Sequence, residues 1–215
     1  MATPFISIKQ HRSSSALLRS LYLPAIALVI FCTGCATTSK QSGQDDANNG
    51  IKVVENRSVD LSIRRKFDNA LELLRDQQYE QAIVLLNEVA NGTQNNSAPY
   101  INLGIAYTKT GQNELAEASF QKALAINPNH PAALNEMGIF YRSIGRFEDA
   151  RLLYERVVNK YPEFMPARRN YGILCDLYLN DVNCALEQYE AYSEANPEDE
   201  TVKIWIATLR QKQVR

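Results

Sequence analysis

Few side chains in this chain could do chemistry. The two histidines, His11 and His130, are not accompanied by cysteines or carboxylates at the spacing that a metal ion requires. The sequence contains no glycine-rich phosphate loop and no nucleophile elbow. The acidic groups Glu148-Asp149 and Glu198-Asp199-Glu200 come where helices should begin, and carboxylates there interact favourably with the helix dipole. We therefore expect no catalytic residue, no metal site and no cofactor.

The first third of the chain is ordered like an export signal. A basic part precedes an uncharged, largely apolar run at 21–31, and small residues follow the run. This order predicts a secretory signal. A retained anchor helix is the alternative, but crossing a bilayer takes about 20 apolar residues in a helix and this run is shorter.

The end of that segment, Thr33-Gly34-Cys35, resembles the lipobox of bacterial lipoproteins, with Cys32 where a leucine is usual. In that family the peptide is cut before the cysteine, which then carries acyl chains such as palmitate. The resemblance implies a signal peptide at 1–34 and lipidation of Cys35. Because Ala36 follows the cysteine, it also implies the bacterial outer membrane, facing the periplasm. Several acyl chains give stable anchoring.

A polar segment follows at 35–62. It is rich in Ser, Thr, Gln, Asn, Asp and Gly, and such a composition buries too little apolar surface to offset the entropy of ordering, so we expect a flexible tether. Without the signal, 20 basic residues face 24 acidic ones, a net charge of −4. Because there is also no basic tract, nucleic acid is not expected as a partner.

The rest of the chain has a period of 34 residues. The same residue types return at this spacing: Gly104, Gly138 and Gly172; Ala82, Ala116 and Ala150; Leu86, Phe120 and Tyr154; Pro128 and Pro162. A fixed period of this length predicts stacked helix–turn–helix units and hence an all-α fold. We place the units at 63–96, 97–130, 131–164 and 165–199.

We number the places within a unit from its first residue. In the second unit, large residues occupy places 4, 7, 11 and 24, which are Tyr100, Leu103, Tyr107 and Phe120. Small residues occupy places 8, 20 and 27, which are Gly104, Ala116 and Ala123, and Pro128 is at place 32. This pattern, repeated in the third unit, resembles the tetratricopeptide repeat. The resemblance implies a right-handed superhelix of about four repeats with a C-terminal capping helix at 200–215.

The outer units match less well. In the first, Ala70 replaces glycine and no proline closes the unit, so an unrelated helical hairpin is the alternative. In the fourth, Tyr189 arrives one place late, which predicts an inserted residue in the turn around Asn180-Asp181-Val182. We expect Trp205 to belong to the core of the capping helix rather than to stack on a ligand.

Cys175 and Cys184 lie on either side of that turn. Cys175 is at place 11, near the end of the first helix, and Cys184 begins the second, so the two should face each other across the hairpin. An exported protein sits in an oxidising compartment, which favours a disulfide between them. Two buried, unpaired thiols are the alternative.

In the tetratricopeptide family the first helix of each unit lines a concave groove. The resemblance assigns ten residues to this groove: Phe67, Leu71, Ile101, Asn102, Ile105, Asn135, Ile139, Arg142, Arg169 and Ile173. Such a mostly apolar strip suits an amphipathic helix or an extended apolar peptide of a partner protein. The alternative is that the aliphatic residues only pack helix to helix. The pattern of the subclass that clamps chaperone C-terminal carboxylates is missing.

The plan of lipobox, tether and array resembles accessory lipoproteins of envelope machines, above all the companions of TonB/ExbB-type systems and type IV pilus assembly lipoproteins. The resemblance implies a scaffold without enzymatic activity, attached to the membrane through Cys35, that binds partner proteins. The alternative function is a regulator or adaptor of peptidoglycan-active enzymes.

Overall fold

The computed structural model describes residues 60–214, and all regular structure in this range is helical. The helices are α1 (Leu61–Arg75), α2 (Tyr79–Gly92), α3 (Ala98–Lys109), α4 (Asn113–Ile126), α5 (Pro131–Ser143), α6 (Phe147–Lys160), α7 (Met165–Leu174), a π-helix η1 (Cys175–Leu179), α8 (Val182–Ala195) and α9 (Glu200–Gln213). The predicted all-α array of about four helix–turn–helix repeats with a further C-terminal helix is confirmed. The signal, Cys35 and nearly all of the tether lie outside the described residues.

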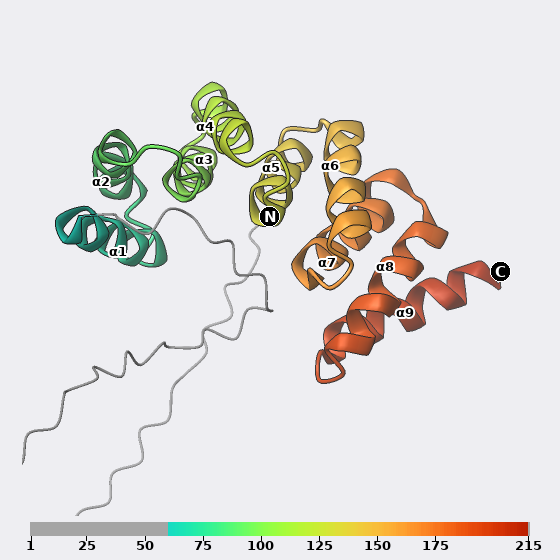
Figure 1. Ribbon diagram of the computed structural model, residues 1–215. Helices are drawn as coiled ribbons and strands as arrows, with labels where there is room; N and C mark the ends of the chain where they lie inside the picture. The colour runs from blue at the N-terminus through green and yellow to red at the C-terminus, as the bar shows by residue number, and fades with distance from the viewer. Residues whose placement is uncertain (1–59, 215) are drawn as a thin grey trace, which may run out of the picture. The chain divides into compact units, whose positions relative to one another are not determined.

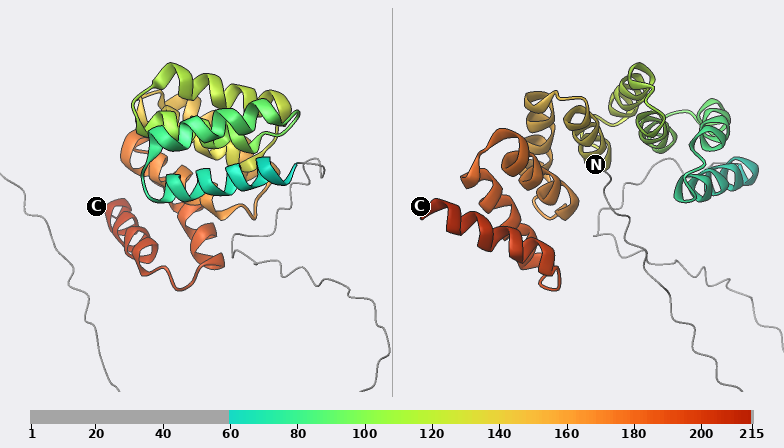
Figure 2. Two further views of the ribbon diagram at one scale, coloured as in Figure 1. Left: turned by 90° about the vertical axis from the view of Figure 1, so that its left-hand side faces the viewer. Right: turned by 180° about the vertical axis from the view of Figure 1, so that it is seen from behind.

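The helices of residues 61–213 pack as antiparallel pairs in a row (Figure 1). The two helices of a pair contact each other, and the second helix of each pair also contacts the first helix of the next. First helices touch one another as well, α1 with α3, α3 with α5 and α5 with α7. Together α1, α3, α5 and α7 make one surface, which we call the first-helix face. Figure 2 shows the same row from two other sides.

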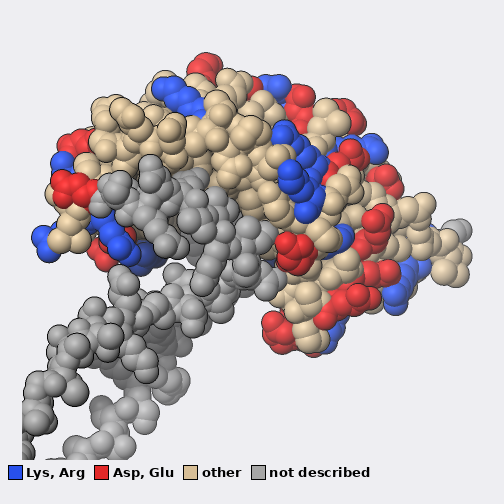
Figure 3. Space-filling model, viewed as in Figure 1, with Lys and Arg blue, Asp and Glu red and all other residues tan. Residues whose placement is uncertain are grey.

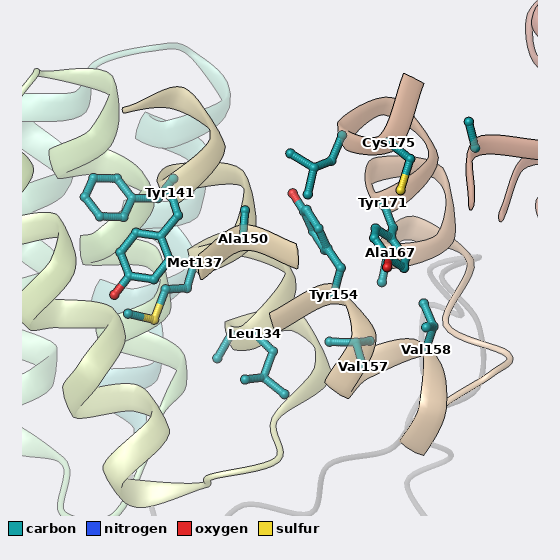
Figure 4. Close-up of a cluster of buried hydrophobic side chains, with 14 of the residues drawn as sticks. Leu134, Met137, Tyr141, Ala150, Tyr154, Val157, Val158, Ala167, Tyr171 and Cys175 are labelled. Atoms are coloured by element: carbon teal, nitrogen blue, oxygen red, sulfur yellow. The ribbon is translucent and has the colours of Figure 1, made fainter. Parts of the chain in front are cut away.

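The two helices of a repeat approach closely because of one residue pair, at places 8 and 24 (8 and 25 in the fourth repeat). In the second to fourth repeats a glycine of the first helix lies under an aromatic ring of the second. A Cβ atom at Gly138 would come within 2.7 Å of the ring of Tyr154, and Tyr154 is fully buried. In the first repeat the pair is Ala70 and Leu86, both fully buried. Figure 4 shows Tyr154 in the apolar core between α5, α6 and α7.

Turns between paired helices need one residue in the left-handed region. Gly111 and Gly145 fill this place with φ of 73° and 80°, Gln77 does so with 60°, and Asn180 with 53°. In the first three repeats the amide N–H after this residue donates to the carbonyl at place 11, as Arg146 does to Tyr141 over 2.8 Å.

The fourth repeat reaches the same turn with one residue more. Its acceptor, the carbonyl of Cys175, is still at place 11, but the donor is the amide of Asp181, 2.9 Å away. The extra residue therefore lies between Cys175 and Asn180, where the backbone forms η1. We expected it in the turn around Asn180-Asp181-Val182, which was wrong. A π-helix takes up one additional residue inside a helix without changing the turn.

The last helix, α9, has the spacing of a first helix. Its buried residues Val202, Ile206 and Leu209 follow Ala167, Tyr171 and Leu174 of α7 by 35 residues each, and they cover the side of α8. The adjoining side of α9, where a second helix would pack, carries exposed Lys203, Ala207 and Arg210. α9 is thus the first half of another repeat, with a polar outer face that ends the stack.

Two details of the helix ends differ from expectation. α1 begins at Leu61, two residues before the first expected unit, because the Asp60 carboxylate accepts a hydrogen bond from the amide of Ser62 (3.1 Å) and caps the helix. Asp199 likewise caps α9 rather than standing inside its first turn, accepting from the amides of Thr201 and Val202.

Candidate functional site

A line of aliphatic side chains runs along the first-helix face at place 9. It consists of Leu71, Ile105, Ile139 and Ile173, one from each repeat, and all four are half-buried. The three isoleucines pack against the core with part of each side chain while the rest stays open to solvent. Phe67 of α1 is half-buried in the same way. The face therefore carries one partly exposed aliphatic side chain from each repeat at this place.

Two of the residues assigned to the groove do not belong to its surface. Ile101 is 7% exposed and Asn135 is 3% exposed, because α5 contacts both α3 and α7. For these two positions the alternative interpretation holds, and they pack between helices. Asn102 stays half-buried at the surface, where its amide donates to the carbonyl of Ala98 within α3 (2.9 Å).

Polar groups of α5 and α7 form a network across the same face. The amide of Asn170 donates to Asn135 Oδ1 over 3.0 Å, and Asn135 Nδ2 donates to the carboxylate of Glu136, also over 3.0 Å. Arg142 Nη1 donates to the backbone carbonyl of Asn170 (3.3 Å). The structure thus brings together Asn135 and Arg142 from the third repeat with residues of the fourth.

Burial changes the protonation behaviour of this region. Desolvation raises the pKa of Glu136, against the hydrogen bond from Asn135 and the positive charge of Lys109. Desolvation also raises the pKa of Tyr154, on which the charges of Arg142 and Glu136 act as well. Among the described residues, the Tyr154 hydroxyl is a buried side-chain group without any hydrogen-bond partner.

The C-terminal end of the face is formed by Arg169 and Trp205. The guanidinium of Arg169 lies over the indole ring, 5.2 Å from its centroid. Trp205 packs on the ring of Tyr189 (5.3 Å between centroids) and is half-buried. The indole is therefore part of the cap core, as expected, and also a support for a groove residue.

The structure joins Cys175 and Cys184 by a disulfide, with the Cα atoms 5.9 Å apart. Cys175 is buried at the start of η1, and Cys184 lies in the first turn of α8. The bond closes the hairpin next to the inserted residue. The disulfide lies between the two helices of the hairpin and not on the first-helix face, so we assign it a structural role.

The remaining candidates for chemistry have structural roles. His130 caps α5, with Nδ1 accepting from the amide of Ala133 (3.4 Å). Glu148 and Asp149 stand in the first turn of α6. Between residues 60 and 214 no three potential metal-ligating side chains gather, and no helix there has the length and apolar character needed to span a membrane. Cys35 lies outside the described range.

A separate hollow of about 420 Å³ lies between α8 and α9. Its lining is Glu190, Ser193, Glu194, Lys203, Ile206, Ala207 and Arg210, and Arg210 pairs with Glu190 over 2.9 Å. This is where the second helix of a fifth repeat would pack. Its charged lining suits exposure to water.

Residues 95–163 match the family model of the tetratricopeptide repeat. The described residues therefore have the tetratricopeptide fold, and the family match covers its central repeats. Human tetratricopeptide repeat protein 16 is 30% identical over 94 residues, which is 44% of this chain but only 11% of the human protein. The resemblance to that protein therefore concerns the repeats alone.

Solved structures show the same tetratricopeptide fold. Pseudomonas aeruginosa pilF aligns with a TM-score of 0.65 at 23% identity, covering 71% of this chain and 69% of that one. MamA from Desulfovibrio magneticus RS-1 aligns with a TM-score of 0.61 at 22% identity, covering 73% and 88%. A tetratricopeptide repeat protein from Parabacteroides merdae gives 0.59 at 19%, covering 71% and 60%. At these identities the likeness concerns the fold.

The sequence did not reveal two members of the polar region, Glu136 and the hydroxyl of Tyr154. Tyr154 stands 34 residues after Phe120, so the period places its ring in the core and says nothing about the oxygen atom. The repeat pattern says nothing about Glu136. Phe120 and Tyr154 occupy the same place in successive repeats, and only Tyr154 has a hydroxyl. This difference was the one signal in the sequence that could have pointed to the buried oxygen atom.

Proposed function

We propose that the chain is a scaffold without enzymatic activity, which binds a segment of a partner protein along the first-helix face. The observation that carries this proposal is the line of half-buried aliphatic side chains that recurs in each of the four repeats. Tetratricopeptide repeats commonly bind protein segments in this way, and an apolar strip with polar edges suits an amphipathic helix or an extended apolar peptide.

The binding test replaces two members of the strip by charge. Ile105→Glu with Ile139→Glu should abolish capture of the partner in pull-downs from membranes with the intact chain, while helical circular dichroism is retained. The matched control is Val84→Glu with Leu152→Glu, which adds the same two charges at exposed positions on second helices (58% and 64% exposed). If Ile105→Glu with Ile139→Glu captures the partner as well as the unaltered chain does, the partner binds to another surface.

We further propose that the protein is an outer-membrane lipoprotein facing the periplasm, and that its partner belongs to an envelope machine of the TonB-type or type IV pilus class. The lipobox-like Thr33-Gly34-Cys35 and the polar stretch after it support this proposal. Cys35→Ser should release the protein from the outer-membrane fraction and remove metabolic palmitate labelling. Labelling that persists in Cys35→Ser would contradict the lipid anchor. A pull-down that recovers cell-wall synthases or hydrolases instead would favour the adaptor alternative.

A further inference from the structure

We propose that Arg142 and Arg169 bind a side-chain carboxylate of the partner, so that the bound segment carries an aspartate or glutamate between apolar residues. This inference rests on the groove proposed above and specifies the chemistry of its occupant.

The two arginines belong to neighbouring repeats, and Arg142 reaches across to the next one. Arg142 belongs to α5 but reaches α7, where it touches the carbonyl of Asn170, the residue next to Arg169. Both side chains are half-buried on the first-helix face. Both charges act on Tyr189: desolvation and the charge of Asp176 raise the pKa of its hydroxyl, and Arg169 and Arg142 counteract this rise.

Neither guanidinium has a carboxylate partner in the described part of the chain. Elsewhere in the array arginines do pair with carboxylates, as Arg146 does with Glu117 over 2.9 Å and Arg151 with Glu155 over 2.9 Å. Arg142 has instead a backbone carbonyl, and Arg169 an indole ring. A guanidinium stacked on a ring keeps its N–H edge free, and that planar edge matches a carboxylate.

Local carboxylates do not satisfy this charge. Glu136 accepts its hydrogen bond from Asn135 and lies under the influence of Lys109, and Asp176 makes no ion pair with either arginine. The charge of Arg169 acts on Asp199, but that carboxylate makes no ion pair with it and accepts from Tyr192, Thr201 and Val202. In the view of Figure 3 the charged side chains lie mostly at the edges and over the C-terminal half, beside a broad uncharged region. The attraction offered to a ligand by Arg142 and Arg169 is therefore local.

The buried hydroxyl of Tyr154 lies in the same region. It has no hydrogen-bond partner, and the charge of Arg142 acts on it. Buried polar groups in folded proteins are normally paired, but this hydroxyl is fully enclosed in the core and cannot itself contact a partner bound on the first-helix face. The two partly exposed guanidinium groups therefore carry the inference.

The position of the arginines favours an internal side chain over a C-terminal carboxylate. Apolar side chains continue on both sides of them, Ile105 and Ile139 towards the N-terminal repeats and Ile173 and the exposed Ile204 towards α9. A bound chain can therefore extend in both directions from its acidic residue.

The test uses peptides rather than the unidentified partner. Random twelve-residue peptides displayed on phage as internal fusions are selected on the purified full chain. Enriched peptides should contain Asp or Glu flanked by apolar residues. One of them, synthesised with an amidated C-terminus, should bind at least about tenfold more weakly when its acid is changed to the amide, since a charged hydrogen bond is lost.

Protein variants locate the contact. In Arg142→Gln with Arg169→Gln the acidic and the amide peptide should bind equally weakly. Arg156→Gln with Lys160→Gln on the exposed side of α6 removes the same charge, and there the difference should persist. Arg142→Lys keeps the charge and disturbs packing least, so this variant should retain part of the preference for the acidic peptide over the amide peptide.

The outcomes separate this inference from the function it rests on. If no peptide is enriched on the folded chain, the groove itself is refuted. If peptides bind through Ile105 and Ile139 but the amide peptide binds as well as the acidic one, only the carboxylate site is refuted. A requirement for a free C-terminal carboxylate would also overturn the proposal of an internal acid.

Discussion

At the scale of single residues, one pair of side chains sets the distance between the two helices of a repeat. Three repeats use glycine under an aromatic ring, and the first uses Ala70 under Leu86. The sum of the two side-chain volumes matters, because the space between two closely packed helices is fixed. The chain itself thus contains two solutions to the same packing problem.

Gly138→Ala tests this account. The new Cβ atom would meet the buried ring of Tyr154 at 2.7 Å. Overpacking of this kind costs about 1–3 kcal/mol, and the better helix propensity of alanine returns up to about 1 kcal/mol. Urea denaturation of the full chain should therefore show a net loss of stability.

The control uses the solution found in the first repeat. Gly138→Ala with Tyr154→Leu recreates the pair Ala70 and Leu86, so the two substitutions together should cost clearly less than the sum of their separate effects. If the changes in the free energy of unfolding caused by the two substitutions are strictly additive, the pair does not set the distance between the helices.

Glu136 allows a prediction about pH. Desolvation raises its pKa in the folded chain above the ordinary 4.5. The folded state therefore holds this proton more tightly than the unfolded state, and stability decreases as pH rises through the folded pKa. Glu136→Gln should raise the free energy of unfolding at pH 7, and this advantage should disappear below about pH 4.5.

Urea titrations at both pH values measure this effect. Glu187→Gln is the control, because it removes the same charge at an exposed site on α8. A Glu136→Gln advantage that stays constant down to pH 4 would show that the carboxylate is not desolvated in the folded chain.

At the scale of helices, the sequence predicted most of the arrangement. The period of 34 residues placed every first and second helix, and the prolines at 128, 162 and 197 fall two residues after α4, α6 and α8 end. The inserted residue of the fourth repeat was counted correctly but placed wrongly. A count between Gly172 and Tyr189 cannot tell a longer turn from a π-helix, because both restore the register of the next helix.

The candidate site was less predictable than the helices. Ile101 and Asn135 share place 5 with Arg169, yet the first two are buried and the third lies on the surface. Exposure at this place depends on how closely the neighbouring first helix packs, which is a property of the assembled repeats. The stacking of Arg169 on Trp205 depends on α9, whose resemblance to a first helix was not recognised.

The disulfide stabilises the hairpin that contains η1. Replacing both Cys175 and Cys184 by alanine should lower the free energy of unfolding by about 2–3 kcal/mol, since the closed loop is short and its entropy in the unfolded chain is restored. Non-reducing mass spectrometry of protein from the periplasm should find no alkylatable thiol at either position. Two free thiols in oxidised, folded protein would contradict the bond.

At the scale of the whole array, each repeat is stabilised by its neighbours. α9 buries Val202, Ile206 and Leu209 against the fourth repeat and contacts none of the earlier helices closely. Stability in such a stack is approximately a sum of repeat and interface contributions. Damage to α9 should therefore spread inwards from the C-terminal end and weaken with distance.

Leu209→Ala tests this local character. The buried leucine is 2% exposed, and its truncation should cost about 2–5 kcal/mol at that end of the array. Hydrogen exchange should accelerate in α7 to α9, while α1 and α2 keep the rates of the unaltered chain. Equal acceleration in all helices would show that residues 60–214 unfold as one cooperative unit instead.

The outer face of α9 has a consequence for solubility. A stack of repeats leaves a packing surface at each end, and a second copy could pack there and continue the stack as a head-to-tail fibre. Inner first helices carry Leu134 and Tyr141 where α9 carries Lys203 and Arg210. Lys203 pairs with Glu200 over 2.8 Å and Arg210 with Glu190 over 2.9 Å, so a copy docking there would have to desolvate these exposed ion pairs. Their charges therefore oppose head-to-tail association through this end.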